Sequence, residues 1–541
     1  MPIAVGVALV ASGLSGLGTA TVARAATAGP ALSVDVGKAR HRISPDIYGM
    51  NFADTALAKE LGLSLDRWGG NSTSRYNYRN NTSSIASDWY FENIVQDTSL
   101  VQFVRRDLHH HTQPVVTVPM TGWVAKRSPS THPFACGFKT SKYGAQQSTD
   151  PYDSDCGDGH QAVTGDNITG NDPRDTSVAA GPSFVKAMVR RLVSLFGPAR
   201  HGGVRTYELD NEPALWNSTH RDVHPKPVTY NELWRRSSAT AAAVKAADRH
   251  ARVAGPGDWG WCAYFYSAAD PDGCSDGPDR KSHHDLAIAA WYLRKFHDYD
   301  KKHHTRLLDY FDEHFYPQEN GVALAGAGDA STQALRLRST RTLWDPSYKD
   351  ESWTSDLGLG PVKLIPRMRA WRNQYYPGTK LSISEYNWGG LESINGALAE
   401  ADVLGIFGRE RLDRALLWSP PASDQPGAFA FRMFRNYDGK GHRFGDIGVS
   451  ATSADQGRLA VYAAQRSSDG ATTVVVINKT GGALSSQLTL KGVRATSAQV
   501  FSYSGANLHR IVRKRAAAVR HSVLTHTYPA NSLTLFVLPP A

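Results

Sequence analysis

The sequence predicts a TIM-like (β/α)8 barrel, an α/β fold, followed by a smaller antiparallel β domain. Short apolar runs alternate with amphipathic helical segments through most of the 541-residue chain, a pattern typical of parallel barrels. After about residue 440 the helical periodicity stops, and strand-like segments separated by turn signals follow. Hydrophobic residues form 41% of the chain and charged residues 20%, which excludes a disordered protein.

The N-terminal segment is expected to be an export signal. Residues 3–22 are apolar and small, and Ala23-Arg24-Ala25 supplies an A-x-A cleavage pattern. We therefore assign residues 1–25 to a signal peptide and expect a secreted, extracellular protein. No Lys or Arg precedes the apolar stretch; a start codon placed too late explains this, and an uncleaved segment is the alternative. Beyond this segment no apolar run reaches the roughly 20 residues of a membrane span, so no membrane partner is expected.

Eight apolar runs that end in polar, Gly or Pro residues are the predicted barrel strands. They lie at 47–51, 63–68, 115–120, 206–209, 252–255, 307–314, 381–385 and 415–419. Helical periodicity fills most intervals, for example at 182–196, 230–247, 286–297, 361–375 and 397–408. We assign residues 47–440 to the catalytic barrel.

Residues 441–541 form the predicted β domain. Its strands are expected at 459–465, 472–478, 487–490, 499–503 and 533–538, and an alternating run at 32–36, within the N-terminal segment 26–46, is expected to join them. Here 11 Lys and Arg stand against 3 acidic residues, so most of the net charge of +10 lies in this domain. A solvated strand face explains the run Arg513-Lys514-Arg515, and attraction to an anionic polysaccharide is the alternative. Aromatic residues do not interleave with the charges, so no nucleic-acid partner is expected.

The four cysteines fall into two near pairs, Cys136 with Cys156 and Cys262 with Cys274. Two local disulfides fit an oxidising destination. Unpaired or metal-bound thiols are the alternative, although no C-x-x-C or Cys/His spacing favours zinc.

Two predicted strand ends carry the candidate catalytic groups. Asn211-Glu212 follows the fourth strand, and Glu385 ends the seventh. In a parallel barrel the C-terminal strand ends build the active site, so these carboxylates are expected to face one another. An opposed acid and carboxylate are what glycosidic cleavage requires. A helix-start or surface carboxylate is the alternative for either residue alone.

The other strand ends add candidate substrate contacts. Sugar rings stack on aromatic faces, and their hydroxyls bond to polar side chains. A structural role is the usual alternative for a single Arg or His, and a core position explains Trp418 equally well. The candidates are Arg67, Trp68, Trp216, His314, Tyr316, Trp388 and Trp418.

At these residues the sequence resembles glycoside hydrolase family 44, a family of secreted endo-β-1,4-glucanases and xyloglucanases. The matching segments run from about residue 47 to residue 446 and lie at 67–71, 76–77, 88–93, 209–216, 218–220, 335–344, 384–390 and 401–405.

The resemblance implies a retaining mechanism with Glu212 as acid/base and Glu385 as nucleophile. It further implies that Asn211 bonds the sugar 2-hydroxyl, that Tyr316 orients Glu385, and that a small β-sandwich built from both chain ends packs beside the barrel. Glu313, next to His314, departs from this scheme as a third carboxylate near the site.

No cofactor is expected for this hydrolysis. Asp150, Asp153, Asp155 and Asp158 cluster around Cys156, an oxygen-rich set that a structural calcium ion favours. The EF-hand spacing is not matched, and a solvated acidic loop is the alternative. The expected partner is a plant polysaccharide bound by a monomeric enzyme. Another retaining barrel glycosidase, such as a xylanase or mannanase, and a non-catalytic polysaccharide-binding protein remain the alternative functions.

Overall fold

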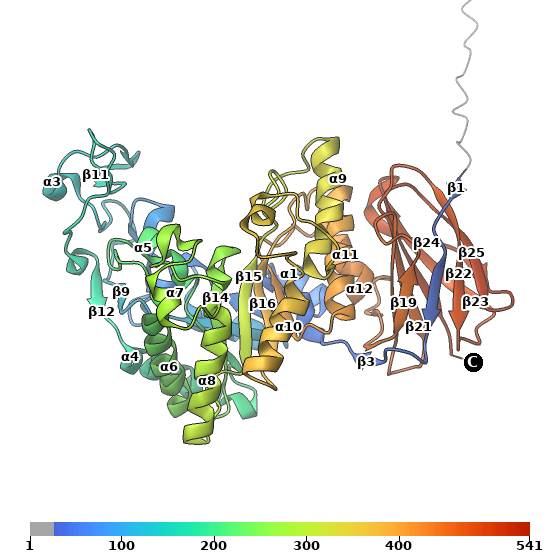
Figure 1. The fold of residues 1–541 in the computed structure, drawn as a ribbon, viewed down its shortest axis with the longest axis horizontal. Coiled ribbons are helices and arrows are strands. Elements are labelled where there is room, and N and C mark those ends of the chain that lie inside the picture. The colour runs from blue at the N-terminus through green and yellow to red at the C-terminus, as the bar shows by residue number, and fades with distance from the viewer. Residues whose placement is uncertain (1–25, 541) are drawn as a thin grey trace, which may run out of the picture.

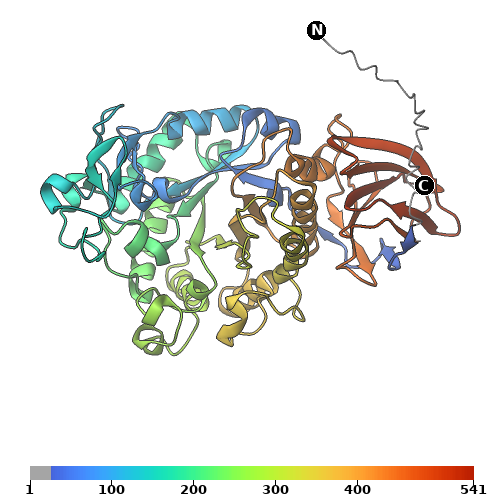
Figure 2. The same ribbon diagram turned by 90° about the horizontal axis from the view of Figure 1, so that it is seen from above.

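The computed structural model describes residues 26–540, and the predicted signal peptide lies outside this range. Eight parallel strands close a barrel in the order β13-β14-β15-β16-β17-β4-β5-β8, and Figure 2 shows the helices arranged around it. All eight predicted strands are confirmed, with ends that shift by at most four residues. Their bounds are β4 Gly49–Asn51, β5 Leu65–Trp68, β8 Gln113–Val118, β13 Thr206–Leu209, β14 Arg252–Trp259, β15 Tyr310–Phe315, β16 Lys380–Tyr386 and β17 Arg414–Leu417.

Helices with one buried face cover the barrel. In α4 the buried residues include Phe184, Met188 and Leu192, the four-residue spacing that lays one face against the strands. The side chain of Ser99 caps α2 by accepting a hydrogen bond from the backbone N–H of Gln102. The helices are α1 Thr55–Leu61, α2 Leu100–His109, α4 Pro182–Phe196, α6 Tyr230–Ala247, α8 Ile288–His303, α9 Ala330–Ser339, α10 Leu364–Tyr375, α11 Ile394–Arg409 and α12 Pro426–Arg435, with short helices α3 Thr140–Tyr143, α5 Trp216–Thr219 and α7 Pro278–Ser282.

Small hairpins extend the top of the barrel, where the loops after β5 and β8 are long. Figure 1 shows α3 and β11 standing out at the end of the molecule away from the β domain. The disulfide Cys136–Cys156 ties this extension together, and Cys262–Cys274 ties the loop after β14. Both predicted disulfides are thus present. The hairpin strands are β6 Thr82–Ser84, β7 Asn93–Val95, β9 Trp123–Ala125, β10 Thr149–Asp150, β11 Asp153–Gly157 and β12 Ser177–Ala179.

The β domain consists of two packed sheets. The first has seven strands in the order β24-β23-β26-β21-β20-β18-β3, and the second joins β1, β2, β19, β22 and β25. Strand β2 enters from the N-terminal side and pairs in parallel with β22, Leu32 opposite Leu488; in Figure 1 it is the blue strand among red ones. The bounds are β1 Thr27–Ala28, β2 Leu32–Asp35, β3 His41–Arg42, β18 Ile447–Gly448, β19 Ser450–Ser453, β20 Leu459–Gln465, β21 Thr472–Asn478, β22 Leu484–Lys491, β23 Ser497–Ser504, β24 Asn507–Ala518, β25 Val523–Tyr528 and β26 Ser532–Leu538.

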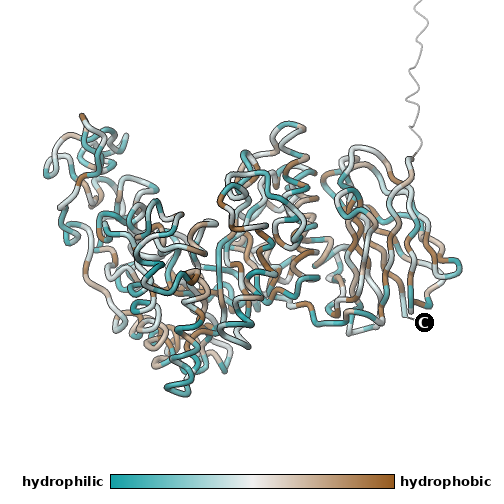
Figure 3. The backbone as a smooth tube through the Cα atoms, viewed as in Figure 1, coloured by the Kyte–Doolittle hydropathy of each residue, from teal (hydrophilic) through white to brown (hydrophobic). Residues whose placement is uncertain are grey.

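The seven-stranded sheet packs against apolar residues on both faces. Tyr503 and Leu535 belong to the same buried cluster as the barrel helices, whereas Val500 and Phe536 face the second sheet. Figure 3 shows the hydrophobic segments gathered inside both units. The seven-stranded sheet thus shares a core with the barrel helices. The domain boundary near residue 440 therefore stays a prediction, and it does not separate two units that fold independently.

Polar contacts reinforce the interface. Asp402 of α11 is buried and accepts hydrogen bonds from Lys479 Nζ at 2.6 Å and from the Tyr462 hydroxyl at 2.8 Å. Across residues 26–540 no helix is both long and apolar enough for a bilayer.

Candidate active site

Glu212 lies on a strained turn directly after β13. Its backbone adopts a left-handed conformation with φ 47° and ψ 62°, which is strained for a non-glycine residue. Its N–H donates to the carbonyl of Gly257 at 2.9 Å. Gly257 itself has φ 66°, and a Cβ there would lie 3.1 Å from Glu208 Oε1. The turn therefore lifts the Glu212 carboxyl above the end of the strand.

Glu385 lies near the end of β16 and is almost fully buried. One of its oxygens accepts a hydrogen bond from Arg67 Nη1 at 2.6 Å, and the other accepts one from the Tyr316 hydroxyl at 2.8 Å. Both carboxylate oxygens are thus held by donors from neighbouring strand ends. This arrangement fixes the orientation of Glu385.

His314, at the end of β15, lies between the two glutamates. Its Nδ1 is 2.9 Å from Glu212 Oε1 and 3.4 Å from Glu385 Oε2. One ligand-type atom from each of these three residues lies within 4.8 Å of the other two. Burial on its own lowers the pKa of His314, but the surrounding carboxylates raise it well above its usual value. The two glutamates therefore favour the protonated form of the ring that lies between them.

Arg67 connects the site through five hydrogen bonds. Nε and Nη2 donate to the two oxygens of Glu208, each at 2.8 Å, Nη1 donates to Asn51 at 2.9 Å as well as to Glu385, and Nη2 also donates to Asn211 at 3.0 Å. All five guanidinium N–H groups are occupied, and the side chain is fully buried. The prediction that Arg67 contacts substrate is therefore wrong for this conformation, because no donor is free.

Glu208 is the buried third carboxylate of the site, and sequence reasoning missed it. It lies inside β13, where its ion pair with Arg67 outweighs burial and holds the pKa of its carboxyl well below the usual range. The sequence signal that could have found Glu208 is its position between Tyr207 and Leu209 in an apolar strand, because a charged side chain at such a position must point into the barrel. The expected third carboxylate, Glu313, is buried, and burial with the charge of Asp258 raises its pKa.

Three of the predicted aromatic platforms are corrected by their burial. Trp216 and Trp388 are fully enclosed, with indole N–H groups that donate to Asn211 O and Ser339 Oγ at 3.1 Å each. Trp68 points out of the barrel and packs edge-on against Phe103 of α2. An aromatic residue near a strand end can face either the cleft or the surrounding helices, and these three face the helices or the loops over them.

Trp418 is partly exposed and stays a candidate platform. Its ring lies across Gly70, where a Cβ would come within 2.7 Å of the indole. Only a glycine allows the ring to lie flat at this position, which also has a φ of 89°.

Two hollows that border α5, the short helix shortly after Glu212, contain further aromatic residues that sequence reasoning missed. A cavity of 470 Å³ begins at Ala214 and is lined by Trp259 and Trp353, and Trp353 is 44% exposed. A second cavity of 760 Å³ is lined by Trp89, which is 40% exposed. Both cavities include Asn217 and Ser218. They therefore lie on the two sides of α5.

The four aspartates of the predicted calcium loop do not gather into one group of ligands within residues 26–540. Asp155 is held by Lys139 and by the backbone of Ser141. Asp150 instead approaches Glu92 and His132, with ligand-type atoms within 4.8 Å of one another. The structure therefore does not bring the four aspartates of the predicted calcium set together.

Comparison with known proteins agrees with this geometry. The sequence pattern of glycoside hydrolase family 44 matches residues 82–319. Endoglucanase A of Paenibacillus lautus is 30% identical over 548 residues, covering 95% of this chain and 73% of the relative. The structure of a bifunctional glucanase-xylanase from a metagenome library has a TM-score of 0.91 and 39% identity, covering 95% of this chain and 100% of that one.

A family 44 xyloglucanase from Paenibacillus polymyxa has a TM-score of 0.78 and 29% identity, with 95% of this chain and 100% of that chain covered. The resemblance found in the sequence motifs is thereby confirmed, and with it the barrel fold and the class of reaction, for which two carboxylates suffice without a cofactor. The chain belongs to glycoside hydrolase family 44 and is a glycoside hydrolase.

Proposed function

We propose that this enzyme is a retaining, endo-acting hydrolase of β-1,4-linked glucan backbones, with Glu212 as acid/base and Glu385 as nucleophile. The observation that carries the proposal is the close approach of the two carboxylates, with one oxygen of each within 4.8 Å of the other. Retaining glycosidases hold their carboxyl groups about 5 Å apart, whereas inverting enzymes leave a wider gap for a water molecule.

In the first step Glu385 attacks the anomeric carbon while Glu212 protonates the leaving oxygen. Burial raises the pKa of Glu212, the hydrogen bond from His314 lowers it, and the negative charge of Glu385 raises it again, so that the net pKa lies above its usual value. A raised pKa keeps the acid protonated at the start of the reaction. Tyr316 and Arg67 hold the nucleophile in line for attack.

In the second step a water molecule releases the sugar from Glu385. The ester carries no charge, so the repulsion that raised the pKa of Glu212 disappears once the glycosyl-enzyme forms. Glu212 then accepts a proton from the water, and the configuration at the anomeric carbon is restored. The amide of Asn211, held by Arg67 and Asn71, is proposed to bond the sugar 2-hydroxyl.

The substrate is proposed to be a β-glucan or xyloglucan, cut at internal bonds. An endo-acting enzyme needs room for sugars on both sides of the cleaved bond, and the cavities at Trp353 and Trp89 flank the segment that follows Glu212. The relatives are an endoglucanase, a glucanase-xylanase and a xyloglucanase. Because one of them acts on both glucan and xylan, xylan is the second candidate substrate.

We further propose that the enzyme is secreted and acts outside the cell as a monomer. The two disulfides support an oxidising destination.

Proton NMR during the first minutes of β-glucan hydrolysis tests the proposal. The β-anomer is expected first, and a 2-fluoro glycoside should trap an ester on Glu385. Glu212→Ala should lose polysaccharide hydrolysis but keep much of the first step with an activated aryl glycoside, with turnover restored by azide. Initial α-product would move Glu385 to general base and refute the retaining mechanism. A polysaccharide panel that includes xylan distinguishes the two substrates.

A further inference from the structure

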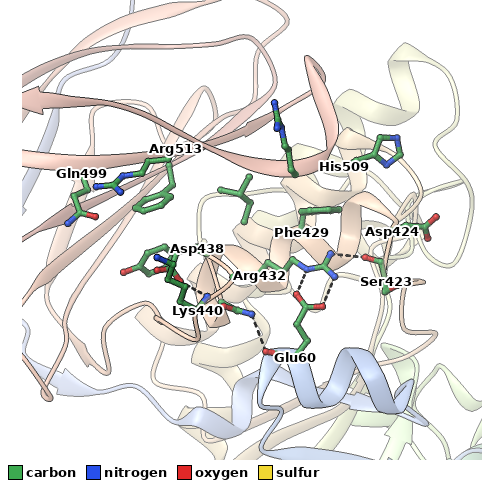
Figure 4. A pocket seen from close by; sticks show the side chains of 16 residues that line it. Glu60, Ser423, Asp424, Phe429, Arg432, Asp438, Lys440, Gln499, His509 and Arg513 are labelled. Atoms are coloured by element: carbon green, nitrogen blue, oxygen red, sulfur yellow. Dashed lines mark hydrogen bonds and ion pairs between the residues drawn. The ribbon is translucent and has the colours of Figure 1, made fainter.

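A third hollow lies away from the glutamates, between the barrel and the β domain. This cavity, of 680 Å³, is lined by α12 and the loop after it on one side and by β23 and β24 on the other. We call it the basic cavity, after its cationic lining residues Arg432, Lys440, His509, Arg510 and Arg513. Figure 4 shows His509 and Arg513 reaching it from the β domain and Arg432 from the barrel.

Within residues 26–540, only one of the four Lys and Arg side chains that line the basic cavity is paired directly with a carboxylate. Arg432 is satisfied, because Nε and Nη2 donate to the two oxygens of Glu60 at 2.6 and 2.7 Å, as the dashed lines in Figure 4 show. By contrast, Lys440, Arg510 and Arg513 have no carboxylate within 4.0 Å among the described residues.

The acidic residues of the lining offset only part of this charge. Asp438 already accepts hydrogen bonds from His442 at 2.7 Å and from the backbone N–H of Lys440. Asp424 remains as the acidic side chain without a cationic partner in this lining. Four Lys and Arg side chains therefore stand against three carboxylates in the lining, and the unpaired Arg510 and Arg513 of β24 give this side of the hollow its attraction for an anion.

Strand β24 extends the charge beyond the basic cavity. It pairs on one side with β23, with Arg513 opposite Phe501, and forms the edge of the seven-stranded sheet. Lys514 and Arg515 follow and are exposed. Charges on an edge strand also protect it from pairing with other chains. That protection accounts for Lys514 and Arg515 but not for Lys440, which lies on a barrel loop across the hollow.

The lining favours a sugar acid over a nucleic acid. Nucleic-acid single strands bind by stacking bases on exposed aromatic rings, and the aromatic side chains here are closed off: Phe429, Tyr437 and Phe501 are at most 7% exposed. A carboxylate-bearing sugar needs cations and a hollow of ring size instead. We propose that the basic cavity and β24 bind the uronate residues of an acidic polysaccharide, as a site separate from the catalytic cleft.

Affinity electrophoresis of the full-length enzyme in gels containing polygalacturonate tests this. We expect retardation that weakens with added salt, and none with neutral dextran. Arg510→Ala/Arg513→Ala should weaken binding about tenfold, because two charge-assisted contacts are lost. The matched control Lys491→Ala/Arg494→Ala removes the same charge from another exposed part of the domain and should change binding less than about twofold.

Three results would overturn the proposal: no retardation of the wild-type enzyme, equal losses in both double variants, or tighter binding of single-stranded DNA or phosphatidylserine vesicles through the same two arginines. Hydrolysis of an aryl cellobioside and the Tm of each variant verify that the fold is intact. Because polygalacturonate binding is read out without hydrolysis, its outcome is independent of the catalytic assignment. Backbone hydrogen exchange should in addition slow in β24 when oligogalacturonate is bound.

Discussion

Arg67 is the residue whose replacement tests the architecture of the site most directly. It is fully buried and forms an ion pair with Glu208, which is equally buried. In Arg67→Met the carboxylate of Glu208 loses both of its guanidinium hydrogen bonds and keeps the Ser384 hydroxyl at 3.1 Å and the ring of His314, whose Nε2 lies 3.7 Å away. The variant therefore leaves a charge inside the barrel without its closest cationic partner.

Breaking a buried pair from one side costs about 3–5 kcal/mol. In Arg67→Met/Glu208→Gln the charge of Glu208 is removed as well, and the cost at this position falls to that of unmade neutral hydrogen bonds, about 1–3 kcal/mol. Glu385 loses its Arg67 donor in both variants, so this loss cancels in the comparison. The double variant should thus be about 2 kcal/mol more stable than the single variant in mildly alkaline buffer. Loss of the donor to Glu385 should also lower kcat/KM in both variants.

The sign of the pH dependence follows from Glu208. In the wild type Arg67 depresses the pKa of Glu208, so the pair adds stability above the carboxyl's unfolded-state pKa and loses it as the pH falls. In Arg67→Met burial raises the pKa of Glu208 and only the ring of His314 opposes it, so the folded variant takes up a proton more readily as the pH falls. The Tm difference between wild type and Arg67→Met should therefore shrink in acid.

Thermal unfolding in mildly alkaline and mildly acidic buffers measures this difference. Arg336→Met is the matched control, because Arg336 is also fully buried but donates only to neutral oxygen atoms, such as Trp388 O and Asn395 Oδ1. Arg336→Met should also be less stable than the wild type, but its Tm difference from the wild type should not shrink in acid. Equal Tm values for the single and double Arg67 variants in alkaline buffer would refute the reasoning.

Three further results are expected. In His314→Gln the cation that lowers the pKa of Glu212 is gone, so the alkaline limb of the kcat/KM profile should move to higher pH; a shift to lower pH would contradict the assignment of the acid. Lys479→Ala leaves Asp402 buried without its ion pair and should cost about 3 kcal/mol in unfolding experiments, whereas Lys479→Ala/Asp402→Asn should recover part of the loss. Trp418→Ala should raise KM at nearly unchanged Tm, and a large fall in Tm at constant KM would show a core role.

The barrel and the two glutamates proposed as catalytic could be predicted from the sequence for one physical reason. Parallel strands bury apolar runs, and their C-terminal ends converge, so Glu212 and Glu385 could be paired without a structure. The direction in which a side chain points could not be predicted from the sequence in the same way. Trp388 lies three residues after Glu385 yet faces Ser339 rather than the cleft, because the chain turns after β16 in a way that no periodicity encodes.

The elements and residues that were not predicted from the sequence were missed for equally specific physical reasons. Strand β24 carries His509, Arg510 and Arg513 on an exposed edge, and so lacks the apolar alternation that marked β20 and β21. Trp353 lies on the irregular stretch between α9 and α10, where spacing conveys nothing about proximity to Glu212. Residues on such loops are placed by tertiary contacts alone.

The pairing of β2 with β22 has a consequence for how the protein is made. More than four hundred residues separate Leu32 from Leu488, its neighbour in the sheet, and β26 inserts between β21 and β23 although it is synthesised after both. A nascent chain on the ribosome cannot complete the five-stranded sheet until β25 has emerged, nor the seven-stranded sheet until β26 has emerged, and contacts so distant in sequence form slowly. An interrupted chain exposes the bare edges of β21 and β23, which recruit other strands. A chain that ends before β26 is therefore expected to aggregate through this domain.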